Sequence, residues 1–312
     1  MVWKSTLSPW VGTRRSRDRR WAQAAAGLGL LLLATVAGGA NARAPSPACA
    51  LVKDLQDPLV HVSFDTVDGR IYVPVRVNGQ GPFRFAVDTG ASGMGRADSS
   101  LVQALALPVL GKADNSDGVS TATATTVQLA SIQLGGLVRT DMEVITRDYA
   151  SRSAAHAKFS GILGREFFAD GLLVIDFPRK RLSFSRASML SSDASGALPY
   201  QRAFRVPVSI GAVQAVGNLD TGANVSFVLP RALYDRVADR PLEAAGQGGL
   251  SNGTLDLQRA PVAGPFKVGD LRLSDVEVRV SDKYPELLVG AHALQQAVVL
   301  VDQRAQAVAL CP

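Results

Sequence analysis

The chain carries the same series of segments twice, and this internal duplication constrains the fold more than any other feature of the sequence. Residues 70–87 alternate as a strand does, turn, and continue as a second apolar strand that runs directly into Asp88. Residues 204–219 repeat this order and run into Asp220, 132 positions after the first aspartate. In both places the aspartate opens the same four residues, Asp-Thr-Gly-Ala. Two similar units are therefore expected on one chain.

The repeat continues downstream of the aspartates. An apolar-apolar-glycine element ends at Gly164 in the first half and at Gly290 in the second half. An apolar strand then ends at Asp176 and at Asp302. Both spacings are 126 residues, so one small change of length relates the two halves. The duplication therefore extends over whole lobes and is not limited to a short motif.

The composition indicates mostly β structure, because apolar runs rich in Val, Leu, Thr and Gly are short and interrupted by turns. Short helices are predicted after each Asp-Thr-Gly, at 99–105 and 231–237. The glycine-rich segment 246–253 is expected to be a loop tip. A stretch at 188–199 is rich in Ser, Ala and Gly and is typical of a linker. The predicted organisation is a signal peptide at 1–44, an N-terminal lobe at 45–190, a linker at 191–198 and a C-terminal lobe at 199–312.

The first 44 residues have the organisation of an export signal. A basic stretch that includes residues 14–20 precedes an apolar run at 22–36, and Ala-Arg-Ala at 42–44 fits a signal-peptidase site. The apolar run is short for a membrane span, which needs about 20 residues. We therefore expect a periplasmic or secreted protein without a stable membrane span after cleavage. An uncleaved anchor is the alternative.

The charge of the chain belongs to this export segment. The formal net charge is +6 for the whole chain, and residues 1–44 hold one Lys, six Arg and one Asp. The remainder is therefore close to neutral and lacks the basic patch that nucleic-acid binding requires.

The two cysteines lie near the two ends of the exported chain, at Cys49 and Cys311. An even number of cysteines in an oxidising compartment suggests a disulfide. Two unpaired thiols are the alternative.

A single Asp-Thr-Gly is an ordinary turn sequence at the end of a strand. Two such triplets at equivalent places in a duplicated chain are different, because equivalent residues near a pseudo-twofold axis face each other. Two carboxylates brought to about 3 Å cannot both ionise readily, so they share a proton. Such a pair can activate water and protonate a substrate carbonyl.

Segments 85–93 and 219–227, with the apolar-apolar-glycine elements at 162–164 and 288–290, resemble the retropepsin/pepsin superfamily of aspartic proteases. The resemblance covers nearly all of residues 60–312 and is nearest to exported bacterial retropepsin-like proteases, here with both lobes on one chain. It implies an all-β, bilobal acid-protease fold in which two homologous β-barrel lobes are related by pseudo-twofold symmetry. It also implies an aspartic endopeptidase that needs no cofactor or metal, acts on a peptide or protein substrate, and pairs its lobes within a monomer.

The resemblance assigns roles to individual residues of the two motifs. The catalytic pair is Asp88 and Asp220. The residues of the supporting loops are Thr89, Gly90, Thr221 and Gly222, and a hairpin near Gly118 is the candidate flap.

The chain also departs from the family pattern. Asn218 stands where the family usually has an apolar residue, Ala291 follows the second apolar-apolar-glycine where Arg165 follows the first, and Tyr149 lies too far along the chain for a pepsin-type flap tyrosine. The two lobes have therefore diverged, and an asymmetric cleft is expected.

Other chemistries find little support. His61, His156 and His292 lie in no motif with a serine or thiol, and we interpret them as surface or structural residues. No His or Cys pair has metal-ligand spacing. The competing hypothesis is a catalytically silent peptide-binding or scaffold protein with the same fold. Pairing of lobes between two chains is a third hypothesis, which the duplication makes unnecessary.

Overall fold

The structure is a computed structural model of the chain, and it describes residues 2–3, 46–149, 151, 154–202, 204–238 and 240–312. The predicted signal peptide at 1–44 lies outside the described residues, apart from the two-residue strand β1 (Val2–Trp3). Within the described part of the chain, no helix is both long enough and apolar enough to cross a membrane.

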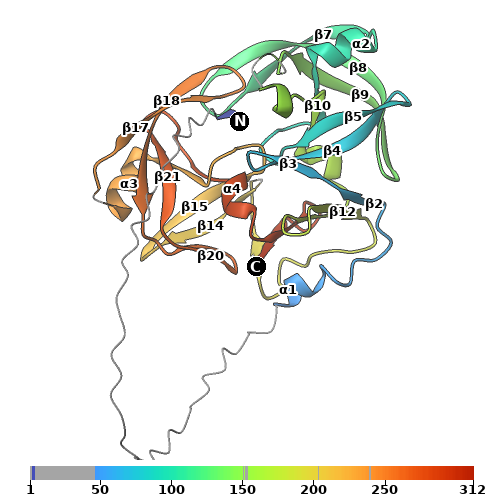
Figure 1. Cartoon of the computed structure of the whole chain (residues 1–312). Helices are drawn as coiled ribbons and strands as arrows, with labels where there is room; N and C mark the ends of the chain where they lie inside the picture. Colours follow the sequence, from blue (N-terminus) through green and yellow to red (C-terminus); the bar gives the residue numbers. More distant parts are fainter. Residues whose placement is uncertain (1, 4–45, 150, 152–153, 203, 239) are drawn as a thin grey trace, which may run out of the picture. The chain divides into compact units, whose positions relative to one another are not determined.

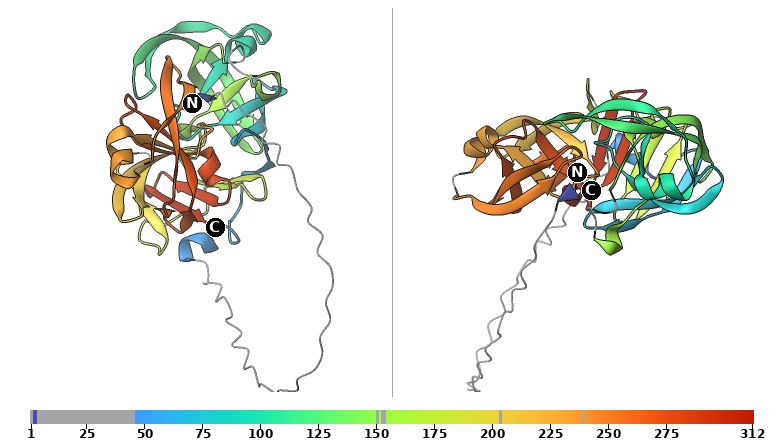
Figure 2. Two further views of the ribbon diagram at one scale, coloured as in Figure 1. Left: turned by 60° about the vertical axis from the view of Figure 1, so that its left-hand side comes forward. Right: turned by 90° about the horizontal axis from the view of Figure 1, so that it is seen from above.

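The predicted fold class is confirmed, because the described residues are mostly strands with a few short helices. Figures 1 and 2 show the first half of the chain (blue to green) and the second half (yellow to red) as two β-rich lobes. The strands of the eight-stranded sheet in the first lobe are β3 (Asp65–Val67), β4 (Arg70–Val77), β5 (Gln80–Val87), β6 (Gly95–Asp98), β7 (Val109–Ser116), β8 (Thr121–Leu134), β9 (Leu137–Arg147) and β10 (Gly161–Leu163).

The second lobe is built on a ten-stranded sheet that includes β1. Its other strands are β14 (Arg205–Ile210), β15 (Val213–Asp220), β16 (Phe227–Pro230), β17 (Glu243–Gly249), β18 (Thr254–Val262), β19 (Phe266–Val268), β20 (Leu271–Leu273), β21 (Val276–Ser281) and β22 (Leu287–Gly290).

The two lobes share one strand order and one register. The order β4-β5-β10-β6-β9-β8-β7 in the first lobe corresponds to β14-β15-β22-β16-β21-β18-β17 in the second. In the parallel pair β5–β10, Phe85 lies opposite Gly161, and in the pair β15–β22 Gly217 lies opposite Leu287. These are equivalent positions under the spacings of 132 and 126 residues, so the sequence duplication is also a structural one.

A third, six-stranded sheet joins the two halves of the chain. Its order is β13-β24-β23-β11-β12-β2, with these bounds: β2 (Val60–Ser63), β11 (Leu172–Asp176), β12 (Arg181–Ser185), β13 (Ala197–Pro199), β23 (Val298–Asp302) and β24 (Ala307–Cys311). Antiparallel strands β11 and β23 pair Val174 with Leu300, its own equivalent in the repeat. The pseudo-twofold axis therefore passes through this pair.

A continuous apolar core runs through both lobes and includes Phe85, Phe167, Phe227 and Phe266, each almost fully buried. The helices are short and lie between strands: α1 (Pro47–Ala50), α2 (Ser99–Ala104), α3 (Arg231–Val237), α4 (Ala291–Leu294) and two 3-10 helices, η2 (Ala155–Ala157) and η3 (Arg165–Phe168). The helices predicted after each Asp-Thr-Gly are confirmed as α2 and α3.

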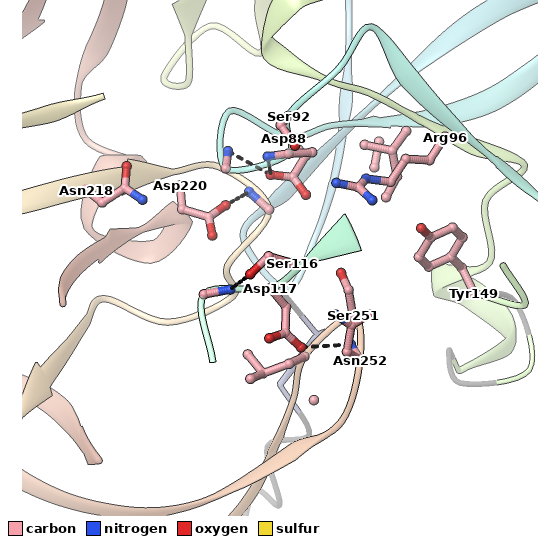
Figure 3. Close-up of a pocket in the computed structure, with 18 of the residues that line it drawn as sticks. Asp88, Ser92, Arg96, Ser116, Asp117, Tyr149, Asn218, Asp220, Ser251 and Asn252 are labelled. Atoms are coloured by element: carbon pink, nitrogen blue, oxygen red, sulfur yellow. Dashed lines mark hydrogen bonds between the residues drawn. The ribbon is translucent and has the colours of Figure 1, made fainter. Parts of the chain in front are cut away.

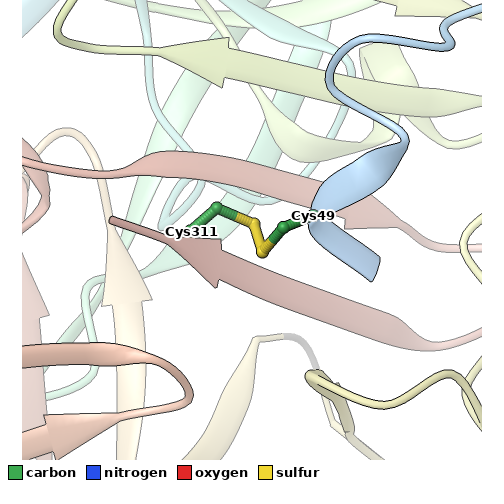
Figure 4. Close-up of a disulfide and its surroundings, with 2 residues drawn as sticks. All are labelled: Cys49 and Cys311. Atoms are coloured by element: carbon green, nitrogen blue, oxygen red, sulfur yellow. A yellow bond between two sulfur atoms is a disulfide. The ribbon is translucent and has the colours of Figure 1, made fainter. Parts of the chain in front are cut away.

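The structure contains the predicted Cys49–Cys311 disulfide, with the two Cα atoms 5.7 Å apart. Figure 4 shows it joining α1 to β24. Both cysteines are buried in a small apolar cluster with Leu172, Leu190 and Leu300. The bridge therefore fixes α1 to the sheet that joins the lobes.

One local prediction was wrong. The glycine-rich segment 246–253 was expected to be a loop tip, but β17 continues through Gly249 and only residues 250–253 turn. The glycines at 246, 248 and 249 instead pair with β18, because a strand ladder needs backbone groups and not side chains. The predicted lobe and linker boundaries stay predictions.

Candidate active site

Two strands, one from each lobe, bring Asp88 and Asp220 to one cavity. Asp88 directly follows β5, and Asp220 is the last residue of β15, its counterpart in the second lobe. Both side chains line a cleft of about 740 Å³ and are largely buried, with 8% and 6% of their surface exposed. Figure 3 shows both side chains among the residues that line this cleft.

The turn that follows each aspartate holds its carboxylate. The backbone N–H groups of Gly90 and Ala91 donate to Oδ1 of Asp88 at 2.9 and 3.0 Å. The N–H of Gly222 donates to Oδ1 of Asp220 at 2.8 Å. Because one oxygen of each carboxylate is occupied in this way, the other is available to a water or a substrate.

The two threonines lock the turns to each other across the lobes. The N–H of Thr89 donates to Oγ1 of Thr221 at 3.1 Å, and the N–H of Thr221 donates to Oγ1 of Thr89 at 3.0 Å. Each hydroxyl then donates to the strand before the opposite aspartate, Thr89 to the carbonyl of Leu219 and Thr221 to that of Val87. All four hydrogen bonds are buried, so the hydroxyls fix the relative position of the two aspartates.

Glycine is required after each threonine because the opposite carboxylate fills the space that a side chain would need. A Cβ added to Gly90 would lie 2.5 Å from Cγ of Asp220, and one added to Gly222 would lie 2.4 Å from Cγ of Asp88. Such contacts are far shorter than van der Waals separation. Each carboxylate therefore packs directly on the turn of the other lobe.

The two carboxylates are buried and close to each other, and both conditions affect their pKa. The pKa of Asp220 is raised to about 7, mainly by burial and then by the charge of Asp88 and a hydrogen bond to its side chain. The N–H of Gly222 acts in the opposite direction by stabilising the carboxylate. The pair consequently keeps one proton at pH values where an ordinary aspartate has lost it.

The apolar-apolar-glycine elements pack closely against the turns that follow Asp88 and Asp220. A Cβ on Gly164 would lie 2.2 Å from the carbonyl oxygen of Gly93, and one on Gly290 would lie 2.3 Å from that of Val225. The residue after each glycine donates its N–H to the fourth residue of the motif, Ala91 or Ala223. The repeat in the sequence therefore reflects a close backbone contact in each lobe.

Two hairpins lie over the cleft, one from each lobe. The β7–β8 hairpin turns at Gly118, where φ is +88°, and the β17–β18 hairpin turns at residues 250–253. Asn252 joins them by donating its N–H to Oδ2 of Asp117 at 2.8 Å and its side-chain amide to the carbonyls of Asn115 and Ser120. The role of Gly118 in a flap stays a prediction, and the second hairpin turns within the segment 246–253, where the sequence indicates a loop tip.

Sequence reasoning also missed the walls of the cleft. Tyr149 lies in the cleft and stacks on Phe159 at 5.7 Å between ring centroids, although its sequence position suggested no role. Tyr284 packs near Gly118 from the second lobe. Neither could be found from the repeat, because nothing in the motif spacing marks these side chains.

The histidines and other ligand types form no second site. His61 bonds to the hydroxyl of Ser183, His156 is exposed, and His292 contacts Asp68 at 3.2 Å. Among the described residues, no three His, Cys, Asp or Glu side chains gather closely enough to hold a metal ion.

Residues 73–167 match the aspartyl protease family. The matched segment runs from β4 to η3 and includes the first Asp-Thr-Gly and Gly164. It is 95 of the 312 residues, just under a third of the chain. The match supports a protease-like function, and the second lobe is linked to it by the shared strand order and register. No curated protein matches the chain.

Proposed function

We propose that the protein is an aspartic endopeptidase, which hydrolyses peptide bonds with a water molecule held between Asp88 and Asp220. The observation that carries this proposal is the symmetry of the site. Two buried aspartates lie in one cleft, each packed on the glycine of the opposite motif. A binding protein would gain nothing from burying two acids in mutual contact, because that arrangement is unfavourable to the folded state.

The chemistry follows from the single proton that the pair shares. The ionised carboxylate takes a proton from the water, whose oxygen attacks the carbonyl carbon of the scissile bond. The protonated carboxyl donates its proton to the carbonyl oxygen, and a neutral tetrahedral diol results. The diol then returns a proton to a carboxylate while the amide nitrogen accepts one, and the C–N bond breaks. One water is consumed, and the pair is left with one proton, as it began.

The cleft supports an extended peptide as the substrate. Its volume of about 740 Å³ is within the range for binding a ligand of several residues, and hairpins from both lobes cover it. The hydrogen bonds of Asn252 to the opposite hairpin would have to open before a chain could enter. The hairpin that carries Gly118 is thereby a candidate flap, and the hairpin at 250–253 is a second.

The cellular setting forms part of the proposal. The basic and apolar start of the chain supports an exported bacterial protein in the periplasm or outside the cell, and the disulfide is consistent with an oxidising compartment. The contacts between the two halves support a monomer whose lobes pair within one chain.

A peptide-library digest of the purified protein at several pH values tests this function. We expect cleavage by the wild type and none by Asp88→Asn or Asp220→Asn, because asparagine cannot take up the proton of the water. Asp65→Asn is a matched control, since Asp65 is exposed on β3 and does not line the cleft. Circular dichroism should show that all variants fold. Full activity of either cleft variant would contradict the assignment, and an inactive wild type that still binds peptides would favour the silent binding protein.

A further inference from the structure

Two arginines of the first lobe are buried in the wall of the cleft. Arg70, at the start of β4, and Arg96, in β6, are only 7% and 6% exposed, and both line the same cavity as the two aspartates. Neither forms an ion pair with a carboxylate among the described residues. Arginine cannot release its proton in a protein, so both positions keep a full charge.

Their hydrogen bonds leave capacity for an anion. Nη1 of Arg96 donates to Oδ1 of Asn115 at 2.8 Å, which uses one of the five N–H groups of the guanidinium. Nε of Arg70 is buried and has no partner in the part of the chain that the structure describes. Because buried charges are normally paired, such arginines mark a place where a ligand supplies the partner.

The surroundings of Arg96 would strengthen that pairing. The same wall carries the apolar side chains of Ala86, Phe159 and Ile162 and the ring of Tyr149. Ion pairs are stronger where such groups exclude water. In Figure 3 Arg96 lies between Asp88 and Tyr149, so a side chain bound there would sit beside the scissile bond.

The second lobe shows that the fold does not require an arginine at this position. Arg96 lies opposite Ile162 in the β6–β10 pair, and Val228 occupies the equivalent place opposite Leu288 in β16–β22. Val228 is fully buried in an apolar cluster. The equivalent positions of the two lobes therefore carry a buried charge in one lobe and a buried apolar side chain in the other.

Several other charges of the cleft are matched within the protein. Arg205 pairs with Glu286. Oδ1 of Asp117 accepts N–H groups from its own turn, and Oδ2 accepts the N–H of Asn252. Arg70 and Arg96 differ from these groups, because both are buried positive charges on the wall of the first lobe without an ion-pair partner among the described residues.

We propose that this wall binds an acidic side chain, Asp or Glu, of the peptide substrate, and that Arg96 is the residue that determines this specificity. Arg70 adds a second positive charge to the same wall. The inference rests on the proposed function. It adds that cleavage sites carry an acidic residue at one fixed position on one side of the scissile bond.

A set of peptides that differ only at that position tests the specificity. The position is found from the library digest, and Glu is then compared with Gln, which has the same shape without the charge. We expect kcat/KM for the Glu peptide to be about ten- to a hundredfold higher in the wild type, the range for hydrogen bonds to charged groups. The Arg96→Gln variant should lose this preference while it still cleaves the Gln peptide.

Arg76→Gln is the matched control, because Arg76 is an exposed arginine of β4 outside the cleft, and it should keep the preference. Equal rates for the two peptides in the wild type would overturn the proposal, and this comparison does not depend on any variant folding. An equal loss for both peptides in Arg96→Gln would also overturn it, since it would indicate a role in positioning Asp88. Preference for a peptide's terminal carboxylate, abolished by amidation, would overturn it as well.

Binding separates this inference from the proposed function. Fluorescence anisotropy of the labelled Glu and Gln peptides is measured on the Asp88→Asn variant, with and without Arg96→Gln. Tighter binding of the Glu peptide that Arg96→Gln abolishes supports the acidic subsite even if the wild type cleaves nothing. Cleavage without any acidic preference supports the protease and overturns the subsite.

Discussion

The threonine network that joins the two motifs predicts a large and symmetric loss of stability when either hydroxyl is removed. Thr89→Val keeps the shape of the side chain but removes two buried hydrogen bonds, one accepted from the N–H of Thr221 and one donated to the carbonyl of Leu219. Thr221→Val removes the equivalent two bonds, to Thr89 and to Val87. Each change leaves two backbone groups buried without a partner.

The magnitude follows from those two groups. A buried donor or acceptor that loses its partner costs about 1–3 kcal/mol, so each variant should lower the free energy of unfolding by about 2–6 kcal/mol. That is a large part of the 5–15 kcal/mol that is typical of a folded protein. Because the two sets of bonds are equivalent, the two losses should agree within about 1 kcal/mol, well inside that range.

Urea unfolding, followed by far- and near-ultraviolet circular dichroism, measures the change in the free energy of unfolding. Thr89→Ser and Thr221→Ser are the controls, because serine keeps the hydroxyl and loses only one methyl group, which costs about 1 kcal/mol. The reasoning is refuted if valine costs no more than serine at either position. It is also refuted if one valine variant is destabilised and the other is not, because the structure makes the two hydroxyls equivalent.

Three further predictions concern the same site and its support. Gly222→Ala should abolish peptide cleavage, since the added Cβ would lie 2.4 Å from Cγ of Asp88. Gly111→Ala in β7, outside the cleft, should not, because its added Cβ would meet only Oγ1 of Thr126 at 3.9 Å; the digest assay compares the two variants. Activity should fall as pH rises through about 7, because the pair loses its shared proton near the raised pKa of Asp220. The same carboxyl should make stability depend on pH, and Asp220→Asn should remove that dependence. The sign follows from linkage. Because the folded state holds the proton more tightly than the unfolded state, stability is lost as the pH rises from about 4 to about 7. Melting temperatures that do not change over that range would contradict this expectation. Cys49→Ser with Cys311→Ser should destabilise the protein by up to about 5 kcal/mol, because the bridge closes a loop of 262 residues, and free thiols in the non-reduced wild type would show that the bridge is absent.

The duplication made the central part of this structure predictable from the sequence. Asp88 and Asp220 were found because each stands at the end of an apolar strand at an equivalent place in the repeat. Gly164 and Gly290 were found in the same way, and their close backbone contacts give the physical reason for their presence in both halves. The pairing of Cys49 with Cys311 was predicted from the even number of cysteines and from the oxidising compartment expected for the chain. These features are short-range patterns or differences in position along the chain, which a sequence displays directly.

The contacts made by single side chains between distant segments were not predictable. Asn252 reaches the β7–β8 hairpin from the other lobe, 135 residues from Asp117. Tyr149 enters the cleft because β9 ends beside β6, which depends on the sheet order. The glycine-rich strand β17 was mistaken for a loop because turn propensity dominates in isolation, while pairing with β18 decides the outcome in the sheet. Such features depend on tertiary packing that no repeat encodes.

The comparison of the two lobes separates what the shared chemistry requires from what a particular ligand requires. Positions at the axis are the same in both lobes, because each carboxylate packs on the opposite glycine and each hydroxyl bonds to the opposite strand. A change on one side would break a contact made by the other. Arg96 and Val228 face no such mutual constraint, since each lies in the wall of its own lobe. One lobe could therefore acquire a buried charge without disturbing the pair of aspartates, and a ligand with opposite charge at that one place accounts for the difference.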